Sequence, residues 1–383
     1  MPPRGPVLSS CTLIASVRQP LSERVLWTSS TCKRSFTPLR GFCKHISATR
    51  RVPTVAVVAP HDSPAIALMP HEQAEFIVAD SLDQMRSHPS FGSVEAMLWI
   101  PPGPPSLLSE LWRGGHVPHC RWVHGFYAGV DAISDFAREL AASDVPLTNG
   151  RGAFSSSLAE YAMAAALHFN KQIPRCMSNR QQRKWDKFVM HELRGRTLGL
   201  VGYGDIAKAT AKIARAFGMR VIALRRNASK PDETGLADLI LGPYSGPIQP
   251  SHKRALFSES DVVVCVLPGT AETRHFVSTA EFEAMKPGSI FISMGRGIAV
   301  DEAALVQALR KGTIAGAALD VFEQEPLPTS SPLWECDNLL LTAHNADFTE
   351  DYFKLGWNVW SKNLSCYLDD QPLATIVDKR AGY

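Results

Sequence analysis

Residues 197–227 read TLGLVGYGDIAKATAKIARAFGMRVIALRRN, and this stretch decides the fold of the region around it. The apolar run at 197–201 leads directly into a glycine turn, GYG. A helical pattern follows until Gly218, and a second apolar run occupies residues 220–224. Strand, glycine turn, helix and strand in this order predict one half of a doubly wound parallel sheet.

The glycine turn fits the pattern Gly-x-Gly-x-x-Ala. Glycines let a phosphate group approach the backbone closely, and the helix that follows presents unpaired N–H groups and the positive end of its dipole. The motif alone also fits a tight turn without a ligand, but the strand–helix–strand context favours the pyrophosphate of a dinucleotide. The expected cofactor-binding residues of the turn are Gly202, Gly204, Asp205 and Ile206.

The end of the second strand predicts which dinucleotide binds. An acid usually stands there when the cofactor has a free ribose 2′-hydroxyl, whereas this chain has Arg225 and Arg226. Guanidinium groups cannot accept a hydrogen bond from a hydroxyl, but their charge and paired donors suit a 2′-phosphate. We therefore predict NADP(H) as the preferred cofactor and NAD(H) as the second choice. Two solvated arginines at a strand end are the alternative.

Outward from this stretch, apolar runs and helical patterns alternate up to about residue 343. A capping box of Ser157 and Glu160 predicts the start of an Ala-rich helix. Asp301 is suited to cap another helix, and Gly312 stands where that helix should end. Six strands are expected in this unit, at 197–201, 220–224, 261–267, 289–294, 314–319 and 338–342.

The chain on either side of this unit predicts a second domain. Apolar runs at 54–59, 75–80, 96–100 and 121–126 indicate buried parallel strands. Near the end of the chain, Phe353, Trp357, Trp360 and Leu364 form one apolar stripe of a helix that needs a partner surface. We therefore predict an α/β fold of two domains. A Rossmann doubly wound cofactor domain, 151–344, is inserted into a flavodoxin-like substrate-binding (catalytic) domain, 52–150 plus 345–383.

Charge divides the 383 residues into a basic leader and an acidic body. Residues 1–51 hold nine Lys and Arg against one acid, Glu23, which leaves 31 basic and 36 acidic residues in the remainder. The folded part therefore has no basic stripe, and we expect no nucleic-acid partner. The leader is rich in Ser, Thr and Arg and is typical of a transit peptide, with an ordinary disordered tail as the alternative. We expect an organellar location, in a mitochondrion or a plastid.

The sequence gives no support for a membrane span or a metal site. No apolar run approaches the ~18 residues of a membrane span, so no membrane partner is expected. Three of the eight cysteines lie in the leader, and the others are scattered without a Cys-x-x-Cys pair, which is typical of a reducing compartment. The cluster His116, His119, Cys120 and His124 has no supporting ligand set, so we predict no metal site.

Several further signatures stand in order along the chain. They are AGVD at 128–131, SLAEYAMAAAL at 157–167, ELRGRTLGLVGYGDIA at 192–207, VLPGTAETRH at 266–275, MKPGSIFISMGRGIAVDEAAL at 285–305 and AGAALDVFEQEPLP at 315–328. With these signatures the chain resembles the D-isomer-specific 2-hydroxyacid dehydrogenase family, which includes glyoxylate and hydroxypyruvate reductases. The resemblance is dense over residues 128–346. Before Phe126 it extends only to the pattern of strands.

The resemblance implies three catalytic residues. Arg296 would hold the carboxylate of a 2-oxo acid and polarise its carbonyl, because a guanidinium supplies fixed paired donors. His344 would donate the proton that the ketone oxygen needs as hydride reaches the carbon, and Glu325 would favour the imidazolium and fix the ring. Ala343 and Asn345 depart from the family's usual Pro-His-(Ile/Val) run, so the resemblance does not predict the geometry of this loop.

The resemblance also implies binding residues outside this trio. Backbone N–H groups of Ala128 and Gly129 would hold the substrate carboxylate together with Arg296. Trp185 matches a tryptophan that in some relatives reaches the site of a partner subunit, and the family dimerises through its cofactor domain, so we expect a homodimer. Further cofactor contacts are expected from Leu267, Pro268, Thr273, Met294, Gly295 and Asp320.

These residues lead to one preferred function and two alternatives. We predict an NAD(P)H-dependent reductase that converts small 2-oxo acids to D-2-hydroxy acids, with glyoxylate or hydroxypyruvate as favoured substrates. A short phosphoglycerate dehydrogenase is one alternative. A non-catalytic dinucleotide-sensing interaction protein is the other, and the organellar leader argues against a nuclear role for it.

Overall fold

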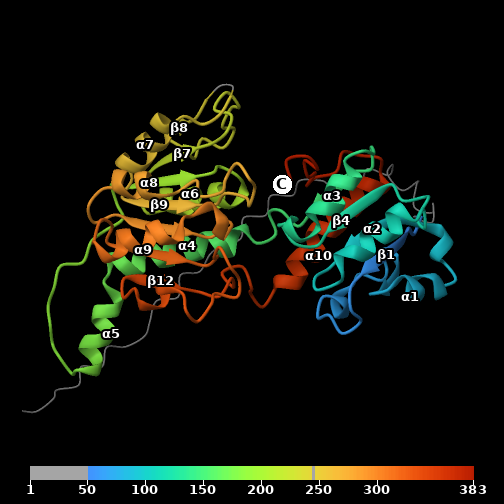
Figure 1. Ribbon diagram of the computed structural model, residues 1–383, viewed down its shortest axis with the longest axis horizontal. Coiled ribbons are helices and arrows are strands. Elements are labelled where there is room, and N and C mark those ends of the chain that lie inside the picture. The colour runs from blue at the N-terminus through green and yellow to red at the C-terminus, as the bar shows by residue number, and fades with distance from the viewer. Residues whose placement is uncertain (1–50, 244–245) are drawn as a thin grey trace, which may run out of the picture. The chain divides into compact units, whose positions relative to one another are not determined.

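The computed structural model describes residues 51–243 and 246–383 (Figure 1). The predicted leader, with its three cysteines and its expected targeting role, lies outside the described residues except for Arg51. The described chain forms two separate parallel β-sheets with helices packed on them, which confirms the predicted α/β class. Among the described helices, none has the length and apolar character that crossing a bilayer requires.

The first sheet has the strand order β2-β1-β3-β4-β5, and all its pairings are parallel. The four predicted strands are present, and a short fifth strand, β5, follows them. Strands β1, β3 and β4 are buried along their whole length, as expected for parallel strands that carry helices on both faces. The elements of this region are β1 Thr54–Val58, β2 Glu75–Ala79, α1 Leu82–Ser87, β3 Val94–Trp99, α2 Pro105–Arg113, β4 Trp122–Gly125, α3 Ser134–Leu140 and β5 Leu147–Asn149.

The last helix, α10 (Tyr352–Leu368), packs on this first sheet. The predicted apolar stripe is confirmed, because Trp357, Trp360 and Leu364 are all buried in one cluster with residues of β1, β3 and β4. Trp360 stacks on Trp122 with ring centroids 6.1 Å apart. Large aromatic side chains contribute much of the buried area of a core. The chain therefore returns to its first sheet after it has built the second.

The second sheet has the order β12-β11-β10-β9-β6-β7-β8, again with parallel pairings throughout. The six predicted strands are confirmed, but a seventh, β8, lies at the edge beside β7. It has only three residues, which is too short for a sequence pattern to separate from a loop. The elements are α4 Ser155–Asn170, α5 Ile173–Gln181, β6 Thr197–Val201, α6 Asp205–Ala216, β7 Arg220–Leu224, β8 Leu239–Leu241, α7 Pro250–Glu259, β9 Val262–Cys265, α8 Thr279–Ala284, β10 Ile290–Ser293, α9 Glu302–Arg310, β11 Gly316–Leu319 and β12 Leu339–Leu341.

The helix ends confirm one capping prediction and correct another. The side chain of Asp301 caps α9 by accepting a 3.0 Å hydrogen bond from the backbone N–H of Ala304, and Gly312 follows that helix with φ at +67°. The predicted capping box of Ser157 and Glu160 is wrong, because α4 begins at Ser155. The hydroxyl of Ser157 instead donates to the carbonyl of Ala346 at 2.6 Å. A partner distant in sequence has replaced the expected local cap.

The parallel arrangement of the second sheet places its loops where a site is expected. The carboxyl ends of parallel strands meet at one edge, and ligands bind in the crevice outside that edge. The glycine turn follows β6, the arginine pair follows β7, and the loops with Arg296, Glu325 and His344 follow β10, β11 and β12. One edge of the sheet therefore carries the predicted cofactor and catalytic residues.

Candidate active site

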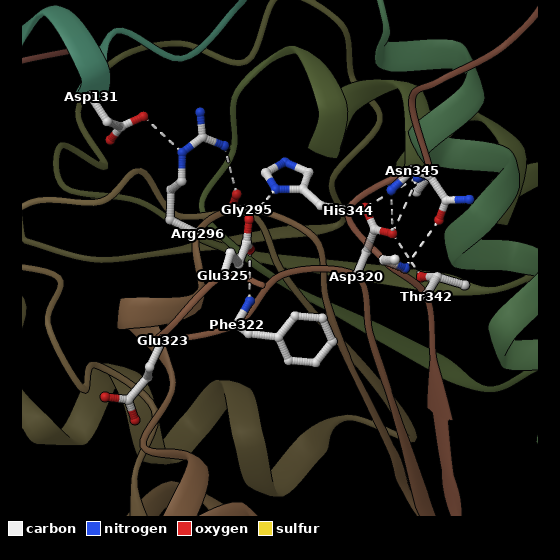
Figure 2. A network of polar contacts seen from close by, with 12 residues as sticks. Asp131, Gly295, Arg296, Asp320, Phe322, Glu323, Glu325, Thr342, His344 and Asn345 are labelled. Atoms are coloured by element: carbon white, nitrogen blue, oxygen red, sulfur yellow. Dashed lines mark hydrogen bonds and ion pairs between the residues drawn. The ribbon is translucent and has the colours of Figure 1, made fainter. Parts of the chain in front are cut away.

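His344 and Glu325 approach each other from two loops at this edge. Nδ1 of His344 lies 2.7 Å from Oε2 of Glu325 (Figure 2). This hydrogen bond is the main cause that raises the pKa of His344 above its ordinary value, although burial acts in the opposite direction. A raised pKa keeps the imidazole protonated closer to neutral pH, as a general acid requires. The bond through Nδ1 leaves Nε2 as the ring nitrogen for a substrate.

The second oxygen of Glu325 fixes the carboxylate. Oε1 accepts a 2.9 Å hydrogen bond from the backbone N–H of Phe322. Burial by itself would raise the pKa of Glu325, but the bonds from His344 and Phe322 and the charges of His344 and Arg296 leave it below its usual range. Glu325 is therefore a charged partner that stabilises the protonated imidazole.

Reciprocal hydrogen bonds anchor the loop that carries Glu325. The backbone N–H of Glu302 donates to Oε1 of Glu323 at 3.1 Å, and the backbone N–H of Glu323 donates to Oε1 of Glu302 at 2.7 Å. Burial, together with the charges of Glu323 and Glu325, raises the pKa of Glu302. The loop after β11 is thus tied to the first turn of α9.

Arg296 follows β10 and contacts the segment that follows β4 of the first sheet. Its Nε donates to Oδ2 of Asp131 at 2.8 Å, and its Nη1 donates to the carbonyl of Gly295 at 2.8 Å (Figure 2). An added Cβ at Gly129 would lie 1.7 Å from Nη2, so this nitrogen lies directly against the Gly129 backbone. The predicted substrate-binding turn and Arg296 are therefore together, and two bonds fix the guanidinium while Nη2 faces the turn.

Asp131 is a site residue that the sequence reasoning did not assign. It is the acid of the AGVD signature, and its position two residues after the predicted substrate-binding Gly129 is the signal that could have identified it. Ala128, in the same turn, accepts a 2.6 Å hydrogen bond at its carbonyl from Nδ2 of Asn149. The turn is thus held by Asn149 and by the contact with Arg296.

Asp347 is a second acid that sequence reasoning missed. Burial raises its pKa, the charge of His344 opposes this effect, and the charge of Asp320 adds to it. Burial and the charge of Asp347 also raise the pKa of Tyr127 and of Tyr352. The side of the site near His344 therefore combines an acid with two tyrosines, and the only sequence signal was the short distance from His344.

Asp320, expected to contact the cofactor, uses its carboxylate within the protein. It is almost fully buried, at 1% exposure. Oδ1 accepts hydrogen bonds from Oγ1 of Thr342 at 2.7 Å and from the backbone N–H of Asn345 at 3.0 Å, and Oδ2 accepts from the backbone N–H of Ala346 at 3.2 Å (Figure 2). Asp320 therefore holds the loop that carries His344, a task that the sequence did not predict.

The glycine turn after β6 fits the pyrophosphate of a dinucleotide. Gly202 has φ at +95°, a conformation that favours glycine. An added Cβ at Gly204 would meet no atom within 4 Å, so the space in front of α6 is open. Asp205 lies 3.4 Å from Nε of Arg151 through Oδ2, and Ile206 packs against the core. Open space at the N-terminus of a long helix is suited to a phosphate group.

Arg225 and Arg226 have different surroundings. Nε and Nη2 of Arg225 are buried without a hydrogen-bond partner among the described residues. Arg226 is exposed, with Nη1 3.7 Å from Oε2 of Glu272 and its guanidinium 5.1 Å from the ring centre of Tyr383. Buried unpaired donors are costly until an anion satisfies them. The unpaired donors of Arg225 therefore fit a 2′-phosphate.

The remaining predicted cofactor residues lie in the loops after β9 and β10. Oγ1 of Thr273 donates to the carbonyl of Pro268 at 2.6 Å and closes the first of these loops. An added Cβ at Gly295 would lie 2.4 Å from the carbonyl oxygen of Leu267, so the two loops touch only because residue 295 is glycine. Met294, beside it, is buried. These loops form a wall next to the glycine turn.

His124, one member of the histidine and cysteine cluster, has a structural role in the first sheet. His124 is buried in β4, and its Nδ1 lies 2.7 Å from Oγ1 of Thr148. Burial lowers the pKa of His124 to about 3, so the ring is neutral. Within 51–243 and 246–383, no group of three or more His, Cys, Asp or Glu residues is placed to hold a metal ion.

Comparisons with known proteins give the family. Residues 163–346 match the family model described as D-isomer specific 2-hydroxyacid dehydrogenase, NAD binding domain. A glyoxylate reductase from Aeropyrum pernix is 36% identical over 61% of this chain and 69% of its own length. The chain belongs to the D-isomer specific 2-hydroxyacid dehydrogenase family.

Solved structures of this dehydrogenase family share the fold. A family protein from Aeromonas salmonicida is 30% identical, and the match covers 86% of this chain and 100% of that chain with a TM-score of 0.68. A 2-hydroxyacid dehydrogenase from Xanthobacter autotrophicus Py2, solved with NADPH, is 27% identical, with 87% and 100% covered and a TM-score of 0.70. The protein is thus a two-domain oxidoreductase of this family with an NAD(P)-binding domain, as the resemblance predicted.

Proposed function

We propose that the protein is an NADPH-dependent reductase that converts small 2-oxo acids to D-2-hydroxy acids. The observation that carries this proposal is the meeting of Arg296, Glu325 and His344 at one edge of the cofactor sheet (Figure 2). A cationic carboxylate binder beside a proton donor is the set of groups that reduction of a 2-oxo acid needs.

Each of the three residues has a distinct task in this proposal. Arg296 holds the substrate carboxylate through Nη2 beside the Gly129 turn and stabilises the negative charge that develops on the carbonyl oxygen. NADPH, when bound along the glycine turn, supplies the hydride. His344 gives a proton from Nε2 to the same oxygen, while Glu325 holds Nδ1 and keeps the ring charged before the transfer.

The preference for NADPH over NADH rests on Arg225. Its buried Nε and Nη2 have no partner in the described structure, and a 2′-phosphate would supply acceptors and a compensating charge. Arg226 is exposed and lies near the carboxylate of Glu272, which offsets its charge, so we expect a smaller contribution from it. We therefore assign most of the discrimination between the two coenzymes to Arg225.

Glyoxylate and hydroxypyruvate are the favoured substrates. The relative from Aeropyrum pernix is named a glyoxylate reductase, and so are relatives from Pyrococcus furiosus and Thermococcus litoralis. The site supports a substrate with a carboxylate, because Nη2 of Arg296 faces the Gly129 turn while Nε is held by Asp131.

Consumption of NADPH tests the function. The chain without residues 1–51 is mixed with NADPH and, separately, with glyoxylate, hydroxypyruvate, phenylpyruvate and 3-phosphohydroxypyruvate. We expect absorbance at 340 nm to fall fastest with glyoxylate or hydroxypyruvate. Fastest turnover of the phosphorylated acid would identify a phosphoglycerate dehydrogenase, and tight NADPH binding without turnover of any acid would support a sensor.

We also propose a homodimer formed by the segment 171–191. Figure 1 shows α5 projecting from the cofactor sheet, and Trp185, in the loop after it, is 100% exposed. Met177, Val189 and Met190 are exposed in the same segment, and so many exposed apolar side chains favour a protein partner. Light scattering of the wild type and of Trp185→Ser tests this: we expect a dimer that weakens in the variant, and a wild-type monomer would contradict the proposal.

The organellar location is a separate proposal based on the leader. Residues 1–51 fused to a fluorescent protein should direct it into a mitochondrion or a plastid, because the segment is basic, hydroxyl-rich and poor in acids. A fusion that stays in the cytosol would contradict this proposal without affecting the enzymatic one.

A further inference from the structure

The backbone at His344 is unusual for a residue with a side chain. His344 has φ at +50°, in the left-handed region that side chains other than glycine rarely adopt. Such a conformation persists only where neighbouring contacts hold it, and it is typical of sites where strain serves function. The contacts on both sides of His344 therefore decide whether its ring meets Glu325.

The residue after His344 holds the turn on the other side of the imidazole. Oδ1 of Asn345 accepts a 3.1 Å hydrogen bond from the backbone N–H of Ala343, which bridges His344 from one neighbour to the other. The backbone N–H of Asn345 donates in turn to Asp320. Figure 2 shows the carboxamide oxygen of Asn345 turned towards this loop and its nitrogen turned away from the imidazole.

The identity of Ala343 makes this bond possible. Alanine has a backbone N–H that can donate and a φ angle that is free to vary, whereas a proline at this position would have a fixed φ and no N–H. The two departures from the Pro-His-(Ile/Val) run are therefore linked, because Ala343 supplies the donor and Asn345 supplies the acceptor.

We propose that Asn345 is a positioning residue that, through its bond to Ala343, holds His344 in the conformation in which the ring meets Glu325. The chemistry assigned to His344 in this inference rests on the proposed function. The position of the His344 ring beside Glu325, which the inference explains, is independent of that function. Asn345 acts on the backbone and does not touch the reacting atoms. Asp320 holds the loop from the sheet side, and Asn345 holds it from the solvent side.

The first arm of the test measures activity in four variants. Asn345→Ala removes the acceptor, Asn345→Asp keeps an oxygen at the same place, and Ala343→Pro with Asn345→Ala removes the donor together with the acceptor. Asn338→Ala is the matched control, because Asn338 also bonds backbone carbonyls through its side chain but lies before β12. We expect kcat to fall roughly tenfold in Asn345→Ala with an unchanged KM for NADPH. Activity should return in the double variant and stay near wild type in Asn345→Asp and Asn338→Ala.

The second arm needs no turnover. Histidine-labelled protein without ligand is titrated by NMR, and the signal of His344 is assigned by its loss in His344→Gln. The charged groups that face this ring are Glu325, Arg296, Asp320 and Asp347. Because contact with Glu325 raises the pKa of His344, loosening the turn in Asn345→Ala should lower that pKa towards its ordinary value, and the double variant should restore it.

The two arms separate the possible failures. Absence of reductase activity in the wild type would defeat the proposed function, while the titration would still test the positioning of His344. A wild-type pKa of His344 and an unchanged kcat in Asn345→Ala would overturn the inference. Equal losses in Asn345→Ala and in the double variant would overturn it as well, because the bond to Ala343 would then not be the cause.

Discussion

The two arginines of the candidate site, Arg296 at the proposed catalytic end and Arg225 at the proposed coenzyme end, differ in their hydrogen bonding. Arg296 has Nε bonded to Asp131 and Nη1 bonded to Gly295, and His344 is likewise bonded to Glu325. Arg225 has two buried nitrogens that find no hydrogen-bond partner within residues 51–243 and 246–383. The groups to which we assign the chemistry are thus held before a substrate arrives, whereas the group to which we assign coenzyme selection is left for the ligand to satisfy.

The loss of the proton donor should have the largest effect. In His344→Gln we expect kcat to fall roughly 1,000-fold with NADPH affinity unchanged, because the imidazole takes part only in the chemical step. Stopped-flow turnover and fluorescence titration with NADPH measure the two quantities. His119→Gln, at an exposed histidine in the turn before β4, is the control, and equal losses of kcat in both variants would place the chemistry elsewhere.

Removal of the substrate-binding guanidinium should have the second-largest effect. In Arg296→Gln we expect kcat/KM for the 2-oxo acid to fall roughly 100-fold, because paired charged donors to the carboxylate and to the developing oxyanion are removed. Steady-state kinetics at saturating NADPH measures it, with Arg310→Gln at an exposed ion pair as control. If only the KM for NADPH changed, Arg296 would act on the coenzyme and not on the substrate, which would contradict the separate roles of the two ends.

Neutralising Glu325 should reduce the rate and move its pH dependence. In Glu325→Gln we expect kcat to fall roughly thirtyfold at neutral pH. The bond to Glu325 raises the pKa of His344, so its removal lowers that pKa, and activity that needs the imidazolium is lost at a lower pH. The basic limb of the kcat/KM profile should therefore move to lower pH. Movement to higher pH would show that Glu325 does not stabilise the charged ring.

The coenzyme end should give the smallest effect and a different kind of effect. In Arg225→Ser we expect the KM for NADPH to rise roughly tenfold, with kcat and the KM for NADH unchanged, because only the 2′-phosphate loses its partner. Arg220→Ser, at an exposed arginine at the start of the same strand, is the matched control. An equal rise in the KM values for NADPH and NADH would mean that Arg225 supports the end of the strand and does not bind the 2′-phosphate.

The cofactor sheet and its helices show which features of the fold the sequence predicts. In the cofactor sheet, long apolar runs and turn glycines are local signals, so six of the strands and the cap at Asp301 were predictable. Strand β8 was missed because it has three half-exposed residues at an edge. The cap at Ser157 was wrong because its hydroxyl has a partner, Ala346, that no local pattern indicates.

The site was predictable as a set of residues but not as a set of contacts. Arg296 and Glu325 lie in the signatures at 285–305 and 315–328, whereas His344 is predicted from the resemblance alone. The parallel sheet brings the ends of its strands together, and the catalytic roles of the three residues stay predictions. The contact of Asp131 with Arg296 depends on how two loops far apart in the chain approach each other, whereas the bond from the backbone N–H of Ala343 to Oδ1 of Asn345 depends on the conformation of one short loop. The AGVD signature and the short distance from His344 could indicate that Asp131 and Asp347 lie near the site, but not which groups they face.

The proposed function requires hydride transfer to the carbonyl carbon of a 2-oxo acid in a site built around His344. The most direct measurement uses NADPH deuterated at the transferable position with hydroxypyruvate, and mass spectrometry with chiral chromatography of the product. We expect D-glycerate with one deuterium at C2, formed by the wild type and almost absent with His344→Gln. A product without deuterium, the L-isomer, or equal yields from both proteins would contradict it.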